Sequence, residues 1–335
     1  ADFIAARYGK SQAVAATVAL IAIVGSIPYI ALQLKAVASS LETVMGASGE
    51  TVPILGALAL ATTVAMAAFA ILFGTRHIDA TEHQDGLVIA IAAESIVKLL
   101  AFLTVGIVVV YVMFDGFADL IDGSPPALDL GDLIGRTSGW LSWSAITLIS
   151  ACAALLLPRQ FHTVVVENRD PADVGRAVWA FPLYLIAINI FVIPLALAGL
   201  ASFPNGAIDR DMTVLALPLS AGHSGFALIA FVGGFSAATA MVIVECVALA
   251  IMVSNHLVLP LWLRRRMLFG ATIDHDVGER RKAAAGDLGA LVLIARRIAI
   301  FVVLLLGYVY YRAAGERELA AIGLTAFAAI AQIAP

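Results

Sequence analysis

The chain has 335 residues, of which 61% are hydrophobic and only 13% are charged, and its mean hydropathy is +0.98. Soluble domains carry about 25% charged residues, because a surface that faces water needs them. The composition therefore excludes an ordinary soluble domain and predicts a protein whose solvent is mostly lipid. The sequence contains no nucleic-acid-binding motif, so no nucleic-acid partner is expected.

Eight apolar segments follow one another along the chain, and seven look complete. Each complete segment is long enough to cross a hydrocarbon core about 30 Å thick. The short alternating strands of a transmembrane barrel are missing from the pattern. We therefore expect an all-α, polytopic membrane protein that forms a single transmembrane domain over residues 1–335. The segments lie at about residues 11–38, 52–74, 86–114, 138–157, 177–201, 222–255, 289–311 and 318–335.

Both ends of the sequence look cut. The chain lacks an initiator Met and a basic-then-apolar signal peptide, and it stops within an apolar run. The sequence thus predicts an excerpt of a longer membrane protein, truncated at both ends.

Lysine and arginine predict how the segments are oriented, because basic residues gather on the cytoplasmic side. One alternating set of connections holds Arg7, Lys10, Arg76, Arg159, Arg169, Arg176, Arg264, Arg265, Arg266, Arg280, Arg281 and Lys282. The other set holds Arg136, Arg210, Arg312 and Arg317. We therefore expect a multi-pass protein of the plasma membrane whose cytoplasmic parts are residues 1–10, 75–85, 158–176 and 256–288.

The first segment reads VGSIPYIALQLKAV around Pro28, which removes one backbone hydrogen bond and is expected to kink the helix. Tyr29 and Gln33 are spaced i,i+4 and share a face, so they could line a cavity for a polar solute. The alternative is an aromatic packing contact and an interfacial glutamine. Lys35, near the outer end, is expected to reach the membrane interface.

The third segment contains Glu94 and Lys98, also spaced i,i+4. Ionisable residues at membrane depth cost a few kcal/mol, so each is a functional candidate. The favoured interpretation of this pair is mutual neutralisation on one helix face.

The sixth segment carries the stretch FVGGFSAATAMVIVE, residues 231–245. Ser236 and Thr239 share a face and could bind a small cation together with backbone carbonyls. The alternative is that both hydroxyls bond only to carbonyls of their own helix. Glu245 has no basic partner within one turn, so a role in a solute or ion pathway is expected.

Catalytic patterns are weak. Ser224, within Gly222–Gly225, resembles an intramembrane protease nucleophile, but the later histidines His256 and His275 fall on the opposite side of the membrane. We expect neither catalytic residues nor an organic cofactor in this chain; its metal chemistry is unknown beyond a possible sodium ion.

Several stretches resemble the sodium/solute symporter family, the group that carries proline, sugars and pantothenate. The first is RYGKSQAVAATVALIAIVGSIPYIALQLKAV, and LPRQFHTVVVEN and FSAATAM follow in the same order as in the family. Longer phrases such as GTRHIDATEHQDGLVIAIAAESIVKLL and VIVECVALAIMVSNHLVLPL resemble the transporter-like domains of sensor histidine kinases.

This resemblance implies an inverted-repeat fold of five plus five helices, in which the first segment here pairs with the sixth. It implies sodium binding near Ser236, although Ala237 stands where the family has a second hydroxyl. Thr239 could replace that hydroxyl, or a proton could be the coupling ion. It also implies an ion-passage role for Glu82 and a substrate contact for Tyr29.

The expected function is cation-coupled transport of a small polar solute, such as an amino acid, by alternating access. The expected partners are the solute, the lipid bilayer and a cytoplasmic histidine kinase region of the same parent chain. The alternative is a nutrient-sensing receptor domain that signals to the kinase without net transport.

Overall fold

The computed structural model describes residues 1–46, 54–74, 85–122, 140–168, 170–204, 208–268, 279–315 and 317–333. All regular structure in these ranges is helical. The helices are α1 (Asp2–Arg7), α2 (Gln12–Met45), α3 (Ile54–Gly74), α4 (Asp85–Val108), η1 (Val109–Met113), α5 (Phe117–Asp122), α7 (Trp140–Leu156), α8 (Pro158–Phe161), η2 (His162–Val166), α9 (Pro171–Asn189), α10 (Val192–Ser202), η4 (Arg210–Met212), α11 (Thr213–Ser220), α12 (Ser224–Val253), η5 (Ser254–Val258), α13 (Leu259–Leu268), α14 (Glu279–Ala314) and α15 (Leu319–Ala331).

Five helical spans within these ranges are long and apolar enough to cross a membrane. The pair of α7 with α8 and η2 is bent by 51° where Pro158 begins α8, and it would be a sixth span if the two parts cross the membrane as one. The shorter apolar helices lie within α3 and α15. The predicted all-α, multi-pass membrane architecture is therefore confirmed. The predicted number of seven complete spans is not reached within the described residues, because the apolar helices in α3 and α15 are shorter, and the fifth predicted segment consists of α9 and α10.

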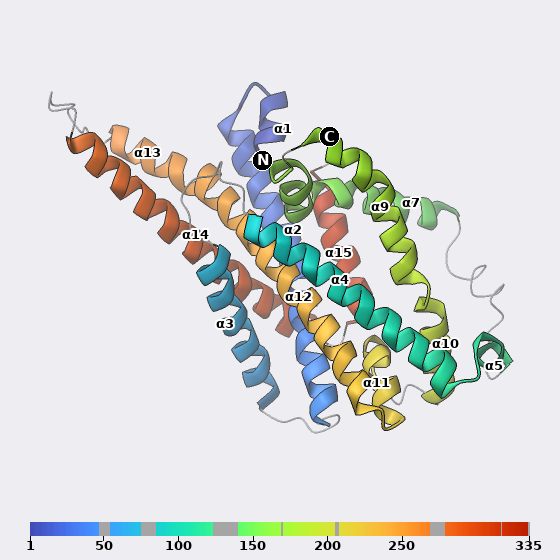
Figure 1. Ribbon diagram of the computed structural model, residues 1–335. Coiled ribbons are helices and arrows are strands. Elements are labelled where there is room, and N and C mark those ends of the chain that lie inside the picture. Colours follow the sequence, from blue (N-terminus) through green and yellow to red (C-terminus); the bar gives the residue numbers. More distant parts are fainter. Residues whose placement is uncertain are drawn as a thin grey trace.

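The helices alternate between two ends of the molecule (Figure 1). The α1 helix, the end of α13 and the start of α14 lie at one end, and α5, α10 and α11 lie at the other. This arrangement agrees with the two alternating sets of connections that the lysines and arginines predict. The assignment of the first end to the cytoplasm remains a prediction.

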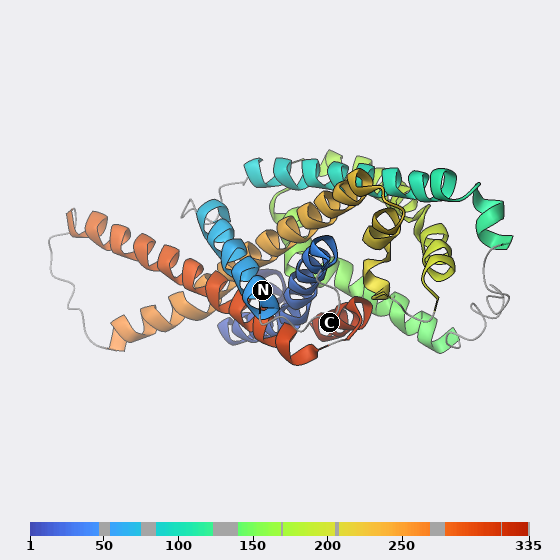
Figure 2. The same ribbon diagram turned by 90° about the horizontal axis from the view of Figure 1, so that it is seen from below.

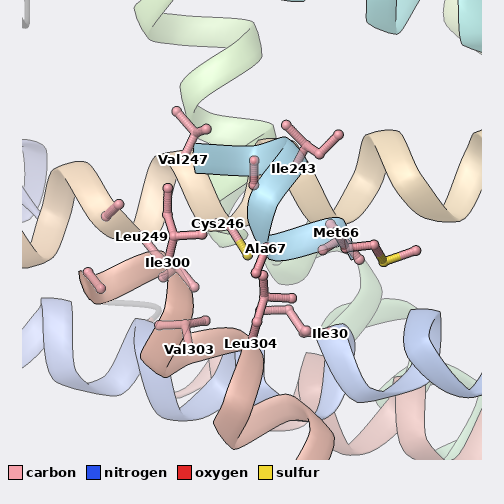
Figure 3. Close-up of a cluster of buried hydrophobic side chains, with 14 of the residues drawn as sticks. Ile30, Met66, Ala67, Ile243, Cys246, Val247, Leu249, Ile300, Val303 and Leu304 are labelled. Atoms are coloured by element: carbon pink, nitrogen blue, oxygen red, sulfur yellow. The ribbon is translucent and has the colours of Figure 1, made fainter. Parts of the chain in front are cut away.

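The core lies where α2, α12, α14 and α3 cross. Small side chains let these helices approach closely, as at Gly307 of α14, where an added Cβ would lie 2.7 Å from Ile30 of α2. Figure 3 shows Ile30, Ala67, Cys246 and Leu304 meeting from the four helices. A second cluster around Val105, Leu195 and Leu217 joins α4, α10 and α11.

Among the described residues, three helices change to π geometry for one turn, at Val109–Met113, His162–Val166 and Ser254–Val258. A π turn accommodates one extra residue and is frequent at functional positions. The last of these joins α12 to α13, which leads out of the bundle on the same side as the start of α14, and the two helices diverge there (Figure 2).

Candidate functional site

The most buried acidic side chain described is that of Glu245, in the second half of α12, with 0% of its surface exposed. The hydroxyl of Ser26, on α2, donates a short hydrogen bond to its Oε1 atom. The Oε2 atom has no hydrogen-bond partner among the described residues. A carboxyl group in this setting is costly as an anion, because burial removes the water that would solvate it.

Tyr29 and Gln33 of α2 point at the same helix. The Tyr29 hydroxyl donates to the sulfur of Met241 across 3.0 Å, and the Gln33 amide lies 3.6 Å from the same sulfur. Met241 is one helical turn before Glu245, so the predicted solute residues and the predicted pathway carboxylate share one crossing of α2 and α12.

A positively charged side chain, that of Arg159, also lies at this crossing of α2 and α12. The guanidinium carbon of Arg159, on the single turn α8, lies 4.7 Å from the centre of the Tyr29 ring. Its charge also acts on Glu245, yet no ion pair within 4.0 Å joins the two among the described residues. The buried Nε atom of Arg159 likewise lacks a hydrogen-bond partner there.

These six side chains form a group that we call the central polar cluster, and it consists of Ser26, Tyr29, Gln33, Arg159, Met241 and Glu245. The bend at Pro158 is what directs α8 toward α12. Its position is held by Leu157, which is buried with Ala153 and Ile330, and by Phe161, whose ring lies 5.7 Å from that of Phe3.

The predicted Glu94–Lys98 pair lies outside this cluster. The Lys98 ammonium is 3.5 Å from Glu94 on the same face of α4, as the i,i+4 spacing indicates. Beside this pair, the Tyr184 hydroxyl donates to the Ser95 carbonyl across 3.3 Å. The geometry agrees with local neutralisation of the two charges.

The hydroxyl pair of the sixth segment is also separate from the cluster. Thr239 donates to the carbonyl of Phe235 on its own helix, which is the alternative that the sequence left open. Ser236 lies nine residues before Glu245, about 14 Å along α12. The assignment of Ser236 and Thr239 as ion ligands stays a prediction, and Glu82 lies outside the described residues.

Sequence reasoning missed Ser26 and Arg159. Ser26 stands three residues before Tyr29, so helical spacing places it on the same face and could have indicated it. Arg159 looks like a membrane-flanking residue, and only the bend at Pro158 brings it inward. A buried arginine of α14, Arg296, was also missed; its Nε donates to Ser254 Oγ across 3.4 Å.

Two polar contacts hold the start of α15 at the opposite end of the bundle, one from α2 and one from η4. The Lys35 ammonium donates to the Arg317 carbonyl, and Asp211 accepts a 2.9 Å hydrogen bond from the Leu319 amide at the start of α15. Lys35 is thus buried against the segment that precedes α15, and its predicted reach to the membrane interface stays a prediction.

No protein-family model, curated protein or solved structure matches this chain. The chemistry must therefore be inferred from the cluster itself. It combines a carboxyl group, a guanidinium, a phenol and an amide from three helices within a largely apolar bundle. Such groups can hold a polar ligand, and the carboxyl group can also take up and release a proton.

Proposed function

We propose that this chain is the membrane domain of a protein that binds a small polar solute, such as an amino acid, and moves it across the plasma membrane by cation-coupled alternating access. The observation that carries this proposal is the convergence of Tyr29, Gln33 and Glu245 with Arg159 at one helix crossing. Polar side chains are costly inside a membrane protein, so their concentration at one place is typical of a binding site.

The resemblance to sodium/solute symporters supports the same interpretation. That resemblance pairs the first predicted segment with the sixth across an inverted repeat, and these segments are α2 and α12, which pack directly against each other. Transporters of this kind bind their solute near the midplane, between the repeats. We therefore propose the five-plus-five architecture for the parent protein, with the cluster as its solute site.

The proposal can be tested by uptake into proteoliposomes that contain the full chain. The probe is a mixture of radiolabelled L-amino acids, offered with a sodium gradient, a pH gradient or neither. We expect uptake that depends on a gradient and is strongly reduced by Tyr29→Ala. Tyr111→Ala, at an exposed position in η1, is the control and should transport normally. Equal uptake by both variants would remove the cluster from the solute site.

Sensing is a second candidate, and the shape of one helix favours it. The 36 residues of α14 span about 54 Å, well beyond a hydrocarbon core of roughly 30 Å. Together with α13 it extends past the bundle at the end predicted to be cytoplasmic (Figure 1). Such an arm could pass the state of the solute site to a kinase region of the parent chain.

A further inference from the structure

The described contacts of Glu245 are too few to stabilise its side chain as a buried, ionised carboxylate. A buried carboxylate needs hydrogen-bond donors or a paired cation to offset the loss of water. The only side chain that donates a hydrogen bond to Glu245 among the described residues is that of Ser26, and Oε2 accepts none. The backbone amide of Arg159 also acts on the carboxyl group, but it does not satisfy the second oxygen. The neutral acid avoids the larger part of this penalty, because burying an uncharged polar group costs much less than burying an ion.

The other ionisable groups around Glu245 leave one candidate counter-charge. Nearest are Tyr29 on α2, Arg159 on α8 and Cys246 beside Glu245. Farther away are the Glu94–Lys98 pair on α4, Arg296 on α14, and His256 in η5, beyond the end of α12. The α3 and α11 helices contribute no ionisable side chain. Lys98 is paired with Glu94, and Arg296 bonds to Ser254, nine residues beyond Glu245. Arg159 is thus the cation that is placed to neutralise a negative charge on Glu245.

We propose that Glu245 binds the coupling ion of the proposed function, that this ion is a proton, and that Arg159 takes the place of the proton when it leaves. The inference rests on the proposed function only in giving the proton a role in transport. The assignment of Glu245 as a proton site rests on the geometry of the cluster. The structure corresponds to the loaded state, in which Glu245 is neutral and Arg159 packs over Tyr29.

Sodium fits this position poorly because a hard cation takes several oxygen ligands. The α12 helix is continuous from Ser224 to Val253, so its carbonyls near Glu245 are used in its own hydrogen bonds. The other side chains of the cluster are the Ser26 hydroxyl, which already bonds to Glu245, the Tyr29 hydroxyl and the Gln33 amide, which meet the Met241 sulfur, and the guanidinium of Arg159. A positive guanidinium repels a metal cation but assists the release of a proton.

Release needs no co-reactant. The O–H bond of Glu245 breaks, the proton passes to water on the open side, and the electron pair stays on the carboxylate. The Nε of Arg159 can then donate to Oε2, so the two atoms that lack partners in the loaded state satisfy each other. Since α8 joins α7 at a 51° bend, movement of Arg159 toward α12 would shift this turn and couple proton release to the shape of the site.

Infrared spectroscopy of the full chain in lipid tests the proton site without knowledge of the solute. We expect a protonated-carboxyl band at neutral pH that disappears in Glu245→Gln and persists in Glu318→Gln, a change at an exposed position. Glutamine keeps an acceptor for Ser26, and circular dichroism verifies that the variant is folded. Absence of the band in the unmodified chain would overturn the proposal, whatever the variants do.

The role of Arg159 is tested by titrating the same band. Removing the nearby positive charge in Arg159→Gln should strengthen proton binding by about tenfold or more and move release to higher pH. Arg176→Gln, whose side chain is largely exposed beside Asp173, should leave the titration unchanged. A titration of Arg159→Gln identical to that of the unmodified chain would refute the exchange between proton and arginine.

Uptake measurements separate this inference from the proposed function. Transport driven by a pH gradient, and lost in Glu245→Gln, supports both. Transport that requires sodium and is lost in Ser236→Ala overturns the proton assignment and leaves the transport function standing. A titrating Glu245 without uptake under any gradient supports the proton site and contradicts transport.

Discussion

At the scale of single residues, the two buried acidic groups of the spans differ in where their partners come from. Glu94 is neutralised from four residues away, so spacing alone predicted its contact. Glu245 is held by Ser26, which lies 219 positions away in the sequence. Periodicity assigns a side chain to a helix face, but it does not say which face of another helix lies opposite. The candidate residues were therefore predictable, and their convergence was not.

Ser26→Ala should destabilise the fold, because it removes the donor to Glu245 and leaves a buried carboxyl oxygen without a partner. We expect a loss of about 1–3 kcal/mol, measured as a lower midpoint of thermal unfolding in detergent. Ser144→Ala is the matched control, since that hydroxyl is exposed and bonds only to Leu141 of its own helix. A Ser26 variant as stable as the Ser144 variant would contradict the importance of this contact.

At the scale of helices, small residues set how closely α12 approaches α4. A Cβ added at Gly233 would lie 2.5 Å from the Cβ of Ala101, whereas one added at Gly234 meets nothing within 4 Å. The sequence alone does not indicate which of these two adjacent glycines packs against another helix. Only the rotation of α12 about its axis decides between them, and this rotation depends on every helix around it.

Gly233→Ala should therefore cost about 1–3 kcal/mol through overpacking. Gly234→Ala should be neutral or stabilising by up to about 1 kcal/mol, because alanine favours the helix. Thermal unfolding of the two variants side by side gives the comparison. A greater loss for Gly234→Ala would show that the crossing of α4 and α12 has a different register.

Asp211 tests the long-range capping of α15. Replacing it with alanine leaves the Leu319 amide without its acceptor, which should cost about 0.5–2 kcal/mol. Asp173→Ala removes only an exposed contact to Arg176, and exposed pairs contribute little. Hydrogen exchange at the start of α15 should accelerate in the first variant alone; equal exchange in both would show that the cap is dispensable.

At the scale of the whole molecule, the all-helical architecture was predictable because the apolar segments are expected to lie in lipid. Backbone groups inside a membrane must bond within their own helix, so long apolar runs can only be helices. The bend at Pro158, the π turns and the short α11 helix were not predictable in the same way. They depend on contacts between segments, such as Leu157 with Ala153 and Ile330.

The orientation can be measured by labelling introduced cysteines with a membrane-impermeant maleimide. Asp119→Cys, exposed in α5, should react in intact cells, and Arg265→Cys, exposed near the end of α13, should react only after permeabilisation. The unmodified chain supplies the background from Cys152 and Cys246. Labelling in the reverse order would invert the predicted topology.

The π turn at Ser254–Val258 allows the rotation of α13 about its own axis to change. If that turn relaxed to ordinary α geometry, the surplus residue would have to pass into a neighbouring turn, and α13 would rotate about its axis by roughly 100° and advance by about 1.5 Å. A small change of winding where Arg296 contacts Ser254 would thus present a different side of α13 to whatever lies next to it, while the crossing at Glu245 stayed in place.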